Sequence, residues 1–324
     1  MLSFVSKTFF RVYLPWIITL AALFMAFRGV ELSSLAQYLK SADLIWLIYA
    51  FALTFLSYML RALRWEYFFV NPVMKYFDSW RVLILGFFMN NILPARAGEL
   101  VRAHSGAKIS GETRTLVLAT IASERLADGL TLSLIFVLFA TGLGDPKLSH
   151  ELLLVAMAFG FAAVLMIMLL FMRKSIFSLA EKLHKKFTNA ASNYALERLK
   201  IFLNGLAPLL TPKKLPASIS LSILIWSIEL SVYFCVSQAF ESSLSLPLCV
   251  LFMVAVNFSS LIPAAPGGIG VIELIGTAAL VSVGIDKQHA LAMVITQHAI
   301  QMITVGIPGI LILLTWKHRS IEKN

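Results

Sequence analysis

The sequence predicts an all-α polytopic membrane protein. Apolar residues make up 59% of the 324 residues and charged residues only 14%. A water-soluble domain of this length needs far more polar surface than this composition supplies. The apolar residues are also collected into runs of the length that crosses a bilayer, which is typical of spanning helices.

Six apolar segments are long enough to cross a bilayer, which takes roughly 20 residues for about 30 Å of hydrocarbon. The first of them is expected to be a retained span, because no small-residue cleavage site follows it. The predicted spans are 13–30, 44–61, 115–141, 151–172, 217–240 and 290–316.

Two further apolar segments, 82–93 and 247–262, each end at a proline–glycine break. The first has 12 residues, which as a helix would be about 18 Å long and too short to cross. Irregular backbone at membrane depth must be buried in protein or line a watery cavity. We therefore expect two re-entrant helical hairpins.

The distribution of charge predicts the topology. Residues 173–214 contain nine Lys or Arg against two Glu, and such an excess is typical of cytoplasmic loops. Segments 61–81 and 94–114 each carry a net charge of +2, as does the tail 317–324. We expect a cell (cytoplasmic or inner) membrane protein with both termini in the cytoplasm. Loops thus explain the overall charge of +10, and no nucleic-acid partner is expected.

The basic segment 173–215 contains a regular apolar pattern. Ile176, Leu179, Leu183 and Phe187 lie at spacings of three or four residues, with lysines between them. This pattern predicts a basic amphipathic helix on an anionic cytoplasmic leaflet. A solvated connector is the alternative interpretation.

Two short stretches indicate an internal repeat. "NILPARAG" at 91–98 resembles "SLIPAAPG" at 260–267, and in each half a span with a polar triplet follows. The aligned break residues are Pro94 with Pro263 and Gly98 with Gly267, and the aligned triplets are Glu124, Arg125, Asp128 and Gln297, His298, Gln301.

Each half, 1–141 and 151–316, then contains two spans, one re-entrant hairpin and a last span with the triplet. The first half begins in the cytoplasm and the second begins outside, so the repeats are inverted within one transmembrane domain, 1–316. Inverted repeats with broken helices are typical of alternating-access transporters.

The charged triplet of the first half has two interpretations. Charges at such depth are unfavourable by about 2.5–3.5 kcal/mol each unless they are paired or hydrated. Arg125 could neutralise Asp128 while Glu124 pairs with Arg96 or Arg102. The same groups could instead bind substrate, and an ion pair that opens for a ligand would do both.

Short helices are expected to begin after "PARAG" and "APGGIG", with their unpaired N–H groups directed at a cavity. Together with Arg96, Arg102, Arg125 and His298 they would form a site for an anionic headgroup. Arg96 and Arg102 could instead be anchors on the cytoplasmic side.

Two acidic residues lie in apolar surroundings, Glu229 inside the span 217–240 and Glu273 after the second break. Each could carry a proton in a coupled cycle, or neutralise Arg125 or His298.

No metal or cofactor is expected. The histidines His104, His289 and His298 and the cysteines Cys235 and Cys249 have no metal-ligand spacing. The sequence contains no P-loop and no GxSxG motif. Facilitated movement, or coupling to a proton or ion gradient, is therefore favoured over transport driven by ATP.

Three motifs carry a family resemblance: "NNILPARAGELVRA", "ERLADG" and "LIPAAPGGIGVIE". Across nearly the whole chain they resemble the flippase-like transmembrane domain of the lysylphosphatidylglycerol synthase family. The resemblance implies a polytopic protein that moves lipids, notably aminoacylated phosphatidylglycerol, to the outer leaflet; some relatives are linked to glycolipid or isoprenoid-lipid pathways. The motif positions are Asn91, Pro94, Arg96, Gly98, Glu99, Arg102, Glu124, Arg125 and Asp128, then Pro263, Pro266, Gly267, Gly268, Gly270 and Glu273.

The sequence departs from the family pattern in two ways. The family often has an arginine where this sequence has His298, whose charge can depend on pH. The soluble aminoacyl-transferase domain of bifunctional members has no counterpart, so synthesis of a lysyl lipid is not expected.

The leading hypothesis is a stand-alone flippase, not an enzyme, whose partners are membrane lipids with anionic or phosphate-bearing headgroups. An oligomer is compatible with the sequence. One alternative is an intramembrane transferase acting on a lipid-linked substrate, with Glu124 or Glu99 as general base. The other is a proton-coupled transporter of a small solute.

Overall fold

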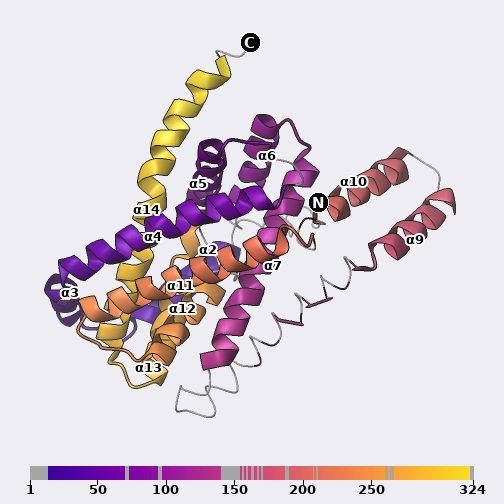
Figure 1. Cartoon of the computed structure of the whole chain (residues 1–324). Coiled ribbons are helices and arrows are strands. Elements are labelled where there is room, and N and C mark those ends of the chain that lie inside the picture. Colours follow the sequence, from indigo (N-terminus) through magenta and orange to yellow (C-terminus); the bar gives the residue numbers. More distant parts are fainter. Residues whose placement is uncertain are drawn as a thin grey trace, which may run out of the picture.

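A computed structural model places helices along nearly all of the chain that it describes (Figure 1). The described residues are 14–69, 73–93, 97–139, 171–186, 190–206, 211–259 and 266–321, with isolated positions between 154 and 168 and at 208 and 262; no strand occurs among them. The first half forms α2 (Leu14–Phe27), α3 (Leu32–Ser41), α4 (Leu44–Tyr67), α5 (Tyr76–Ile92), α6 (Gly98–Ser110) and α7 (Arg114–Phe139). The rest forms α9 (Arg173–Lys186), α10 (Ala190–Leu206), α11 (Leu215–Ala239), α12 (Leu246–Ser259), the short turn η5 (Pro266–Gly268), α13 (Val271–Ser282) and α14 (Lys287–Ile321).

Three of the described helices are long and apolar enough to cross a membrane: α4, α11 and the Lys287–Trp316 part of α14. They coincide with predicted spans. The pair α2 and α3 adds a fourth if it is one span, although the two helices are bent by 85°. The segment 31–43, expected to be a loop, therefore contains a helix. α7 has the predicted extent as a helix, whereas the predicted span 151–172 lies largely outside the described residues.

Large apolar side chains cover the outside of these helices. Leu20, Phe24, Ile48 and Leu314 are each more than half exposed. In water such a surface would cause aggregation, whereas in a bilayer lipid tails cover it. The exposed apolar faces therefore agree with a membrane-embedded protein.

Helices α4 and α11 pack along one another in the middle of the molecule. Asp43 starts α4, because its carboxylate accepts the Ile45 N–H at 2.8 Å and so caps the helix. The Asp43 N–H also donates to the Ala239 carbonyl at 2.8 Å, which ties the start of α4 to the end of α11.

Two pairs of short helices are each interrupted by a break. α5 packs against α6, and α12 packs against α13. The apolar segment 82–93 had suggested a helix of 12 residues, but α5 begins at Tyr76 and has 17, about 25 Å. Glycine allows the close approach of α5 and α6: a Cβ at Gly98 would collide with the Gly86 carbonyl. Both short helices after the breaks, α6 and α13, begin where the sequence predicted.

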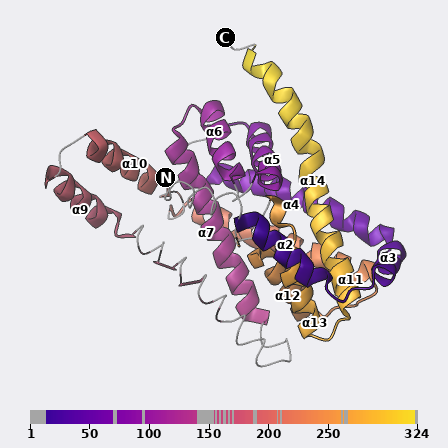
Figure 2. The ribbon, with the colours of Figure 1, turned by 180° about the vertical axis from the view of Figure 1, so that it is seen from behind.

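The packing of the first half has counterparts in the second. α6 contacts α7 as α13 contacts α14, and α4 contacts α5 as α11 contacts α12. Across the halves, α14 contacts α5 and α7 contacts α12. Figure 2 shows α2 alongside the second half, where it packs on α13.

The basic segment forms two helices, α9 and α10, that project to one side of the molecule (Figures 1 and 2). The predicted amphipathic helix corresponds to α9, whereas α10 was expected to be loop. Phe187 and the side chain of Leu183 lie outside the described residues. Leu203 and Leu206 of α10 pack on Ala119 of α7. The basic segment is therefore held against the helix that carries the charged triplet.

Candidate functional site

A network of ion pairs occupies the contact of α4, α7 and α11. Asp128 of α7 lies at its centre: its Oδ1 is 2.7 Å from Arg64 Nη2, and its Oδ2 is 3.3 Å from Arg61 Nη1. The Trp226 indole N–H donates to Asp128 Oδ1 at 3.1 Å. All four side chains are buried. Two guanidinium groups and an indole therefore compensate one buried carboxylate.

A second buried ion pair joins α6 to α7. Arg102 Nη2 lies 2.6 Å from Glu124 Oε2, with side chains only 1% and 0% exposed. The Arg102 guanidinium also stacks over the Trp65 ring at 4.1 Å, a favourable cation–π contact. Burial this complete makes Arg102 a member of the network rather than a surface anchor. Of the two partners suggested for Glu124, Arg102 is the one that the structure shows.

The pair of Arg125 and Glu99 is the accessible end of this network. Arg125 Nε lies 2.9 Å from Glu99 Oε1, and the side chains are 34% and 29% exposed. Asp128, the expected partner of Arg125, is 3.8 Å from its Nη1 and is bound more closely by Arg61 and Arg64. The predicted pair of Arg125 and Asp128 is therefore present, but Arg61 and Arg64 are the closer partners of Asp128.

Glu229 of α11 connects the two halves. Its Oε2 accepts the Ser57 hydroxyl at 3.0 Å and lies 3.6 Å from Arg61 Nη2. Its Oε1 accepts from the Gln301 amide of α14 at 3.2 Å. The expectation that Glu229 neutralises Arg125 or His298 was wrong, because its cationic partner is Arg61.

Among the described residues, one ionisable pair joins α13 to α14 in the second half. His298 Nδ1 of α14 lies 2.6 Å from Glu273 Oε1 of α13, as one of the two expectations for Glu273 had it. His298 Nε2 lies 3.0 Å from the Gly267 carbonyl oxygen. The Gly270 N–H donates to Glu273 Oε2 at 2.5 Å. Glu273 thus caps the start of α13, so its carboxylate already accepts an N–H that was expected to be directed at a cavity.

Neutral groups complete the second-half network. The Gln297 amide donates to the Tyr233 hydroxyl at 3.0 Å, and the Asn257 amide donates to the same oxygen at 3.1 Å. Through Glu229 and Arg61, Gln301 of the α14 triplet is linked to Asp128 of the α7 triplet.

The two breaks lie side by side. A Cβ at Gly267 would lie 3.9 Å from Asn91 Cα and 3.5 Å from the Met302 methyl group. Gly267, Gly268 and Gly270 have φ angles of 73°, 74° and 87°, a region that favours glycine. Three further predicted site residues, Pro94, Arg96 and Pro263, lie outside the described residues.

Arg61 and Arg64 belong to the network but were not predicted from the sequence as site residues. Both were counted as cytoplasmic loop charges after a span ending at residue 61, yet they are only 7% and 0% exposed. Apolar residues continue through Phe68 and Phe69, and this continuation could have shown that the helix extends further. Arg61 and Arg64 therefore do not belong among the loop charges, because they neutralise buried carboxylates.

The buried pairs have a clear energetic consequence. Removing one partner of a buried ion pair typically destabilises a protein by about 3–5 kcal/mol, because the other charge is left uncompensated. Arg61, Arg64, Arg102 and Arg125 balance Glu99, Glu124, Asp128 and Glu229. The four positive and four negative charges of this set of described residues therefore balance.

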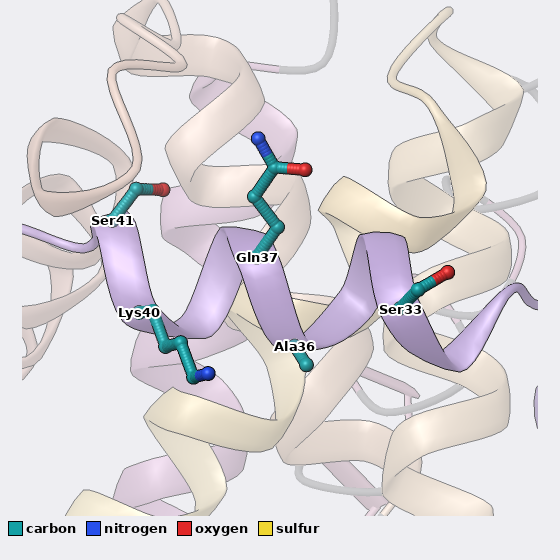
Figure 3. Close-up of a pocket in the computed structure, with 5 residues that line it drawn as sticks. All are labelled: Ser33, Ala36, Gln37, Lys40 and Ser41. Atoms are coloured by element: carbon teal, nitrogen blue, oxygen red, sulfur yellow. The ribbon is translucent and has the colours of Figure 1, made fainter.

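Figure 3 shows a shallow surface depression of about 580 Å³ along α3. Its lining residues are Ser33, Ala36, Gln37, Lys40 and Ser41. None of them belongs to the ion-pair network, so the depression is separate from the candidate site. Among the described residues no group of three or more His, Cys, Asp or Glu side chains could hold a metal ion.

Residues 12–309 match the family described as the lysylphosphatidylglycerol synthase TM region. The chain belongs to this family. Among its relatives, the UPF0104 membrane protein PH1989 of Pyrococcus horikoshii is 21% identical over 322 residues, which cover 91% of this chain and 94% of the relative. A UPF0104 membrane protein of Methanothermobacter thermautotrophicus is 24% identical over 317 residues, 91% of each chain. The UPF0104 membrane protein MJ1078 of Methanocaldococcus jannaschii is 28% identical over 229 residues, 68% of this chain and 91% of the relative. The family match thus covers most of both halves and includes every residue of the network.

Proposed function

We propose that this protein is a membrane lipid transporter, a flippase that moves a phosphate-bearing headgroup between leaflets. The main observation behind this proposal is the charged network around Asp128, which is enclosed by helices whose outer faces are apolar. Intramembrane charges are unfavourable and usually mark a functional pathway. Membership of a family named for the membrane region of a lipid synthase supports a lipid as the substrate.

The proposed architecture has six spans and two re-entrant hairpins arranged as an inverted repeat. The equivalent helix contacts in the two halves support it. α4 and α11, which occupy equivalent places in the two halves, pack on each other and would form the axis. Rocking of one half against the other would then open the polar network to one leaflet at a time.

In this proposal one domain, 1–316, carries the transport activity, and both termini, the segment 173–215 and the tail 317–324 face the cytoplasm of a cell membrane. The partners are membrane lipids with anionic or phosphate-bearing headgroups. The headgroup enters the network while the acyl chains remain in lipid.

The Arg125–Glu99 pair is the proposed first contact for the headgroup. It is the accessible pair of the network, and Arg125 also has Asp128 at 3.8 Å. A phosphate could therefore replace Glu99 on Arg125 without leaving a fully buried charge unpaired. The remaining proposed substrate-binding residues are Arg96, Arg102, Glu124, Asp128, Glu273, Gln297, His298 and Gln301.

An intramembrane transferase is the second candidate, because the family description names a synthase. Glu99 would then be the better general base, since Glu124 is fully buried against Arg102. This candidate requires a lipid product of altered mass.

Leaflet exchange in proteoliposomes tests the proposal. The purified full chain would be reconstituted with fluorescent anionic, zwitterionic and lysyl-bearing phospholipids, and exchange would be followed by chemical quenching. We expect accelerated exchange that Arg125→Leu reduces at least tenfold, while Arg28→Leu, at an exposed arginine outside the network, retains it. Exchange at the wild-type rate in folded Arg125→Leu would overturn the site. A protein that accelerates no lipid but changes a lipid's mass would be a transferase.

A further inference from the structure

We infer that Glu273 and His298 form a proton-binding site that couples lipid movement to a proton gradient. The inference rests on the proposed function and adds its driving ion. It starts from the acceptor groups around the His298 ring, which restrict where its protons lie.

The Gly267 carbonyl oxygen has no proton to give, so its contact with His298 Nε2 at 3.0 Å requires an N–H on that nitrogen. The contact of His298 Nδ1 with Glu273 Oε1 at 2.6 Å then needs one further proton. The proton belongs either to an imidazolium facing a carboxylate or to a carboxylic acid facing a neutral imidazole. In both cases this conformation holds one proton on the line between Nδ1 and Oε1.

Loss of that proton would break the contact. Nδ1 and Oε1 would then face each other with lone pairs only, and a separation of 2.6 Å would become repulsive. The other carboxylate oxygen, Oε2, is held by the Gly270 N–H at 2.5 Å, so Glu273 is fixed to the start of α13. Deprotonation would therefore push α14 away from α13 at the second break.

The surroundings isolate this proton. α2 contributes Thr19 and Leu23 next to Gly270, and α5 contributes Asn91 next to Gly267, none of which is ionisable at neutral pH. On α14 the neighbouring polar residues are the amides Gln297 and Gln301. Gln301 in turn donates to Glu229, which is the nearest ionisable group linked to this part of α14 among the described residues.

The hydrogen bond from Gln301 to Glu229 would link a movement of α14 to the charged network. Gln301 lies almost one helical turn after His298 on α14 and donates to Glu229, which faces Arg61 at 3.6 Å. A shift of α14 on deprotonation would release Gln301 from Glu229 and loosen the link between the halves. In this cycle the proton arrives from water on one side, forms one N–H or O–H bond within the pair, and leaves to water on the other side.

The flippase assay with an imposed pH gradient tests the coupling. His298→Arg keeps a cation beside Glu273 but cannot release a proton under these conditions, and Glu273→Gln removes the carboxylate. His104→Gln, at an exposed histidine of α6, is the matched control. A dye trapped in the vesicles reports proton flux at the same time, and thermal unfolding confirms that each variant is folded.

We expect the wild-type protein and His104→Gln to redistribute lipid between leaflets by about tenfold for a gradient of one pH unit, because one proton per lipid contributes about 1.36 kcal/mol. His298→Arg should lose this response and the lipid-dependent proton flux. Lipid exchange that ignores the gradient in the wild-type protein would leave the flippase intact and overturn the proton site. Absence of any lipid exchange would overturn the proposed function. If the wild-type protein then still carried a proton flux that His298→Arg abolishes, the proton site would be supported. If it carried no such flux, the proton site would be overturned as well.

Discussion

The polar triplets of α7 and α14 occupy equivalent places in the two halves but contain different chemistry. Glu124, Arg125 and Asp128 are all charged, and they take their counter-charges from α4 and α6. The α14 triplet has two amides and one imidazole. Its partners are one hydroxyl and the carboxylates of Glu273 and Glu229.

The two triplets differ in whether their charge is fixed. An arginine stays protonated in proteins, so the positive charges of the first half are permanent. The proposed proton site of the second half is instead the pair of His298 and Glu273. In the proposed cycle a ligand acts on the first half by exchanging ions, whereas a proton acts on the second half by changing its net charge.

The largest expected effect follows from removing charge at the centre of the first half. In Asp128→Asn the side chain keeps its shape but no longer neutralises Arg61 and Arg64 at 3.3 and 2.7 Å. We expect a loss of about 3–5 kcal/mol, measured as the free energy of unfolding in detergent. Asp78→Asn is the control, because Asp78 lies 3.9 Å from Arg81 with a side chain 29% exposed. Equal destabilisation by both substitutions would show that the buried network is not special.

A smaller effect is expected from the neutral network of the second half. Tyr233→Phe removes the hydroxyl that accepts from Gln297 and Asn257 at 3.0 and 3.1 Å. Gln297 is fully buried, so the loss of this partner for its amide should destabilise the protein by about 1–3 kcal/mol. The same unfolding measurement on Tyr49→Phe, whose side chain is 55% exposed, gives the baseline. A loss of unfolding free energy larger than that of Asp128→Asn would mean that the neutral network of the second half contributes more to stability than the charged network of the first half.

Local sequence features predicted much of the architecture. Apolar length located α4, α11 and α14, and the breaks before Gly98 and Val271 located the starts of α6 and α13. These features are local, because helix length and interruption depend on neighbouring residues. The helices α3 and α10 were missed because their sequences are mixed in polarity and contain no span-length apolar run.

The pairing of the charges was harder to predict. Glu273 and His298, 25 residues apart, were paired as one alternative. Arg61 and Glu229, 168 residues apart, were not paired, because sequence gives no distance between α4 and α11. The assumption that cations near the end of a span lie in a loop also assigned Arg61 and Arg64 to water, although both compensate acids of other helices.

The smallest expected effect comes from breaking an exposed ion pair. Comparing it with a buried pair of the same length separates the effect of distance from that of burial. Lys200 Nζ lies 2.6 Å from Glu181 Oε1 with side chains 42% and 50% exposed, and Arg102 lies equally close to Glu124 with side chains 1% and 0% exposed. Water and salt screen the exposed pair, so Lys200→Ala should leave the unfolding midpoint unchanged at 0.15 M salt. Arg102→Met should lower it clearly, because Glu124 would keep a buried charge without its partner. Equal shifts from the two substitutions would mean that the distance between the ions, rather than their burial, sets the strength of the network.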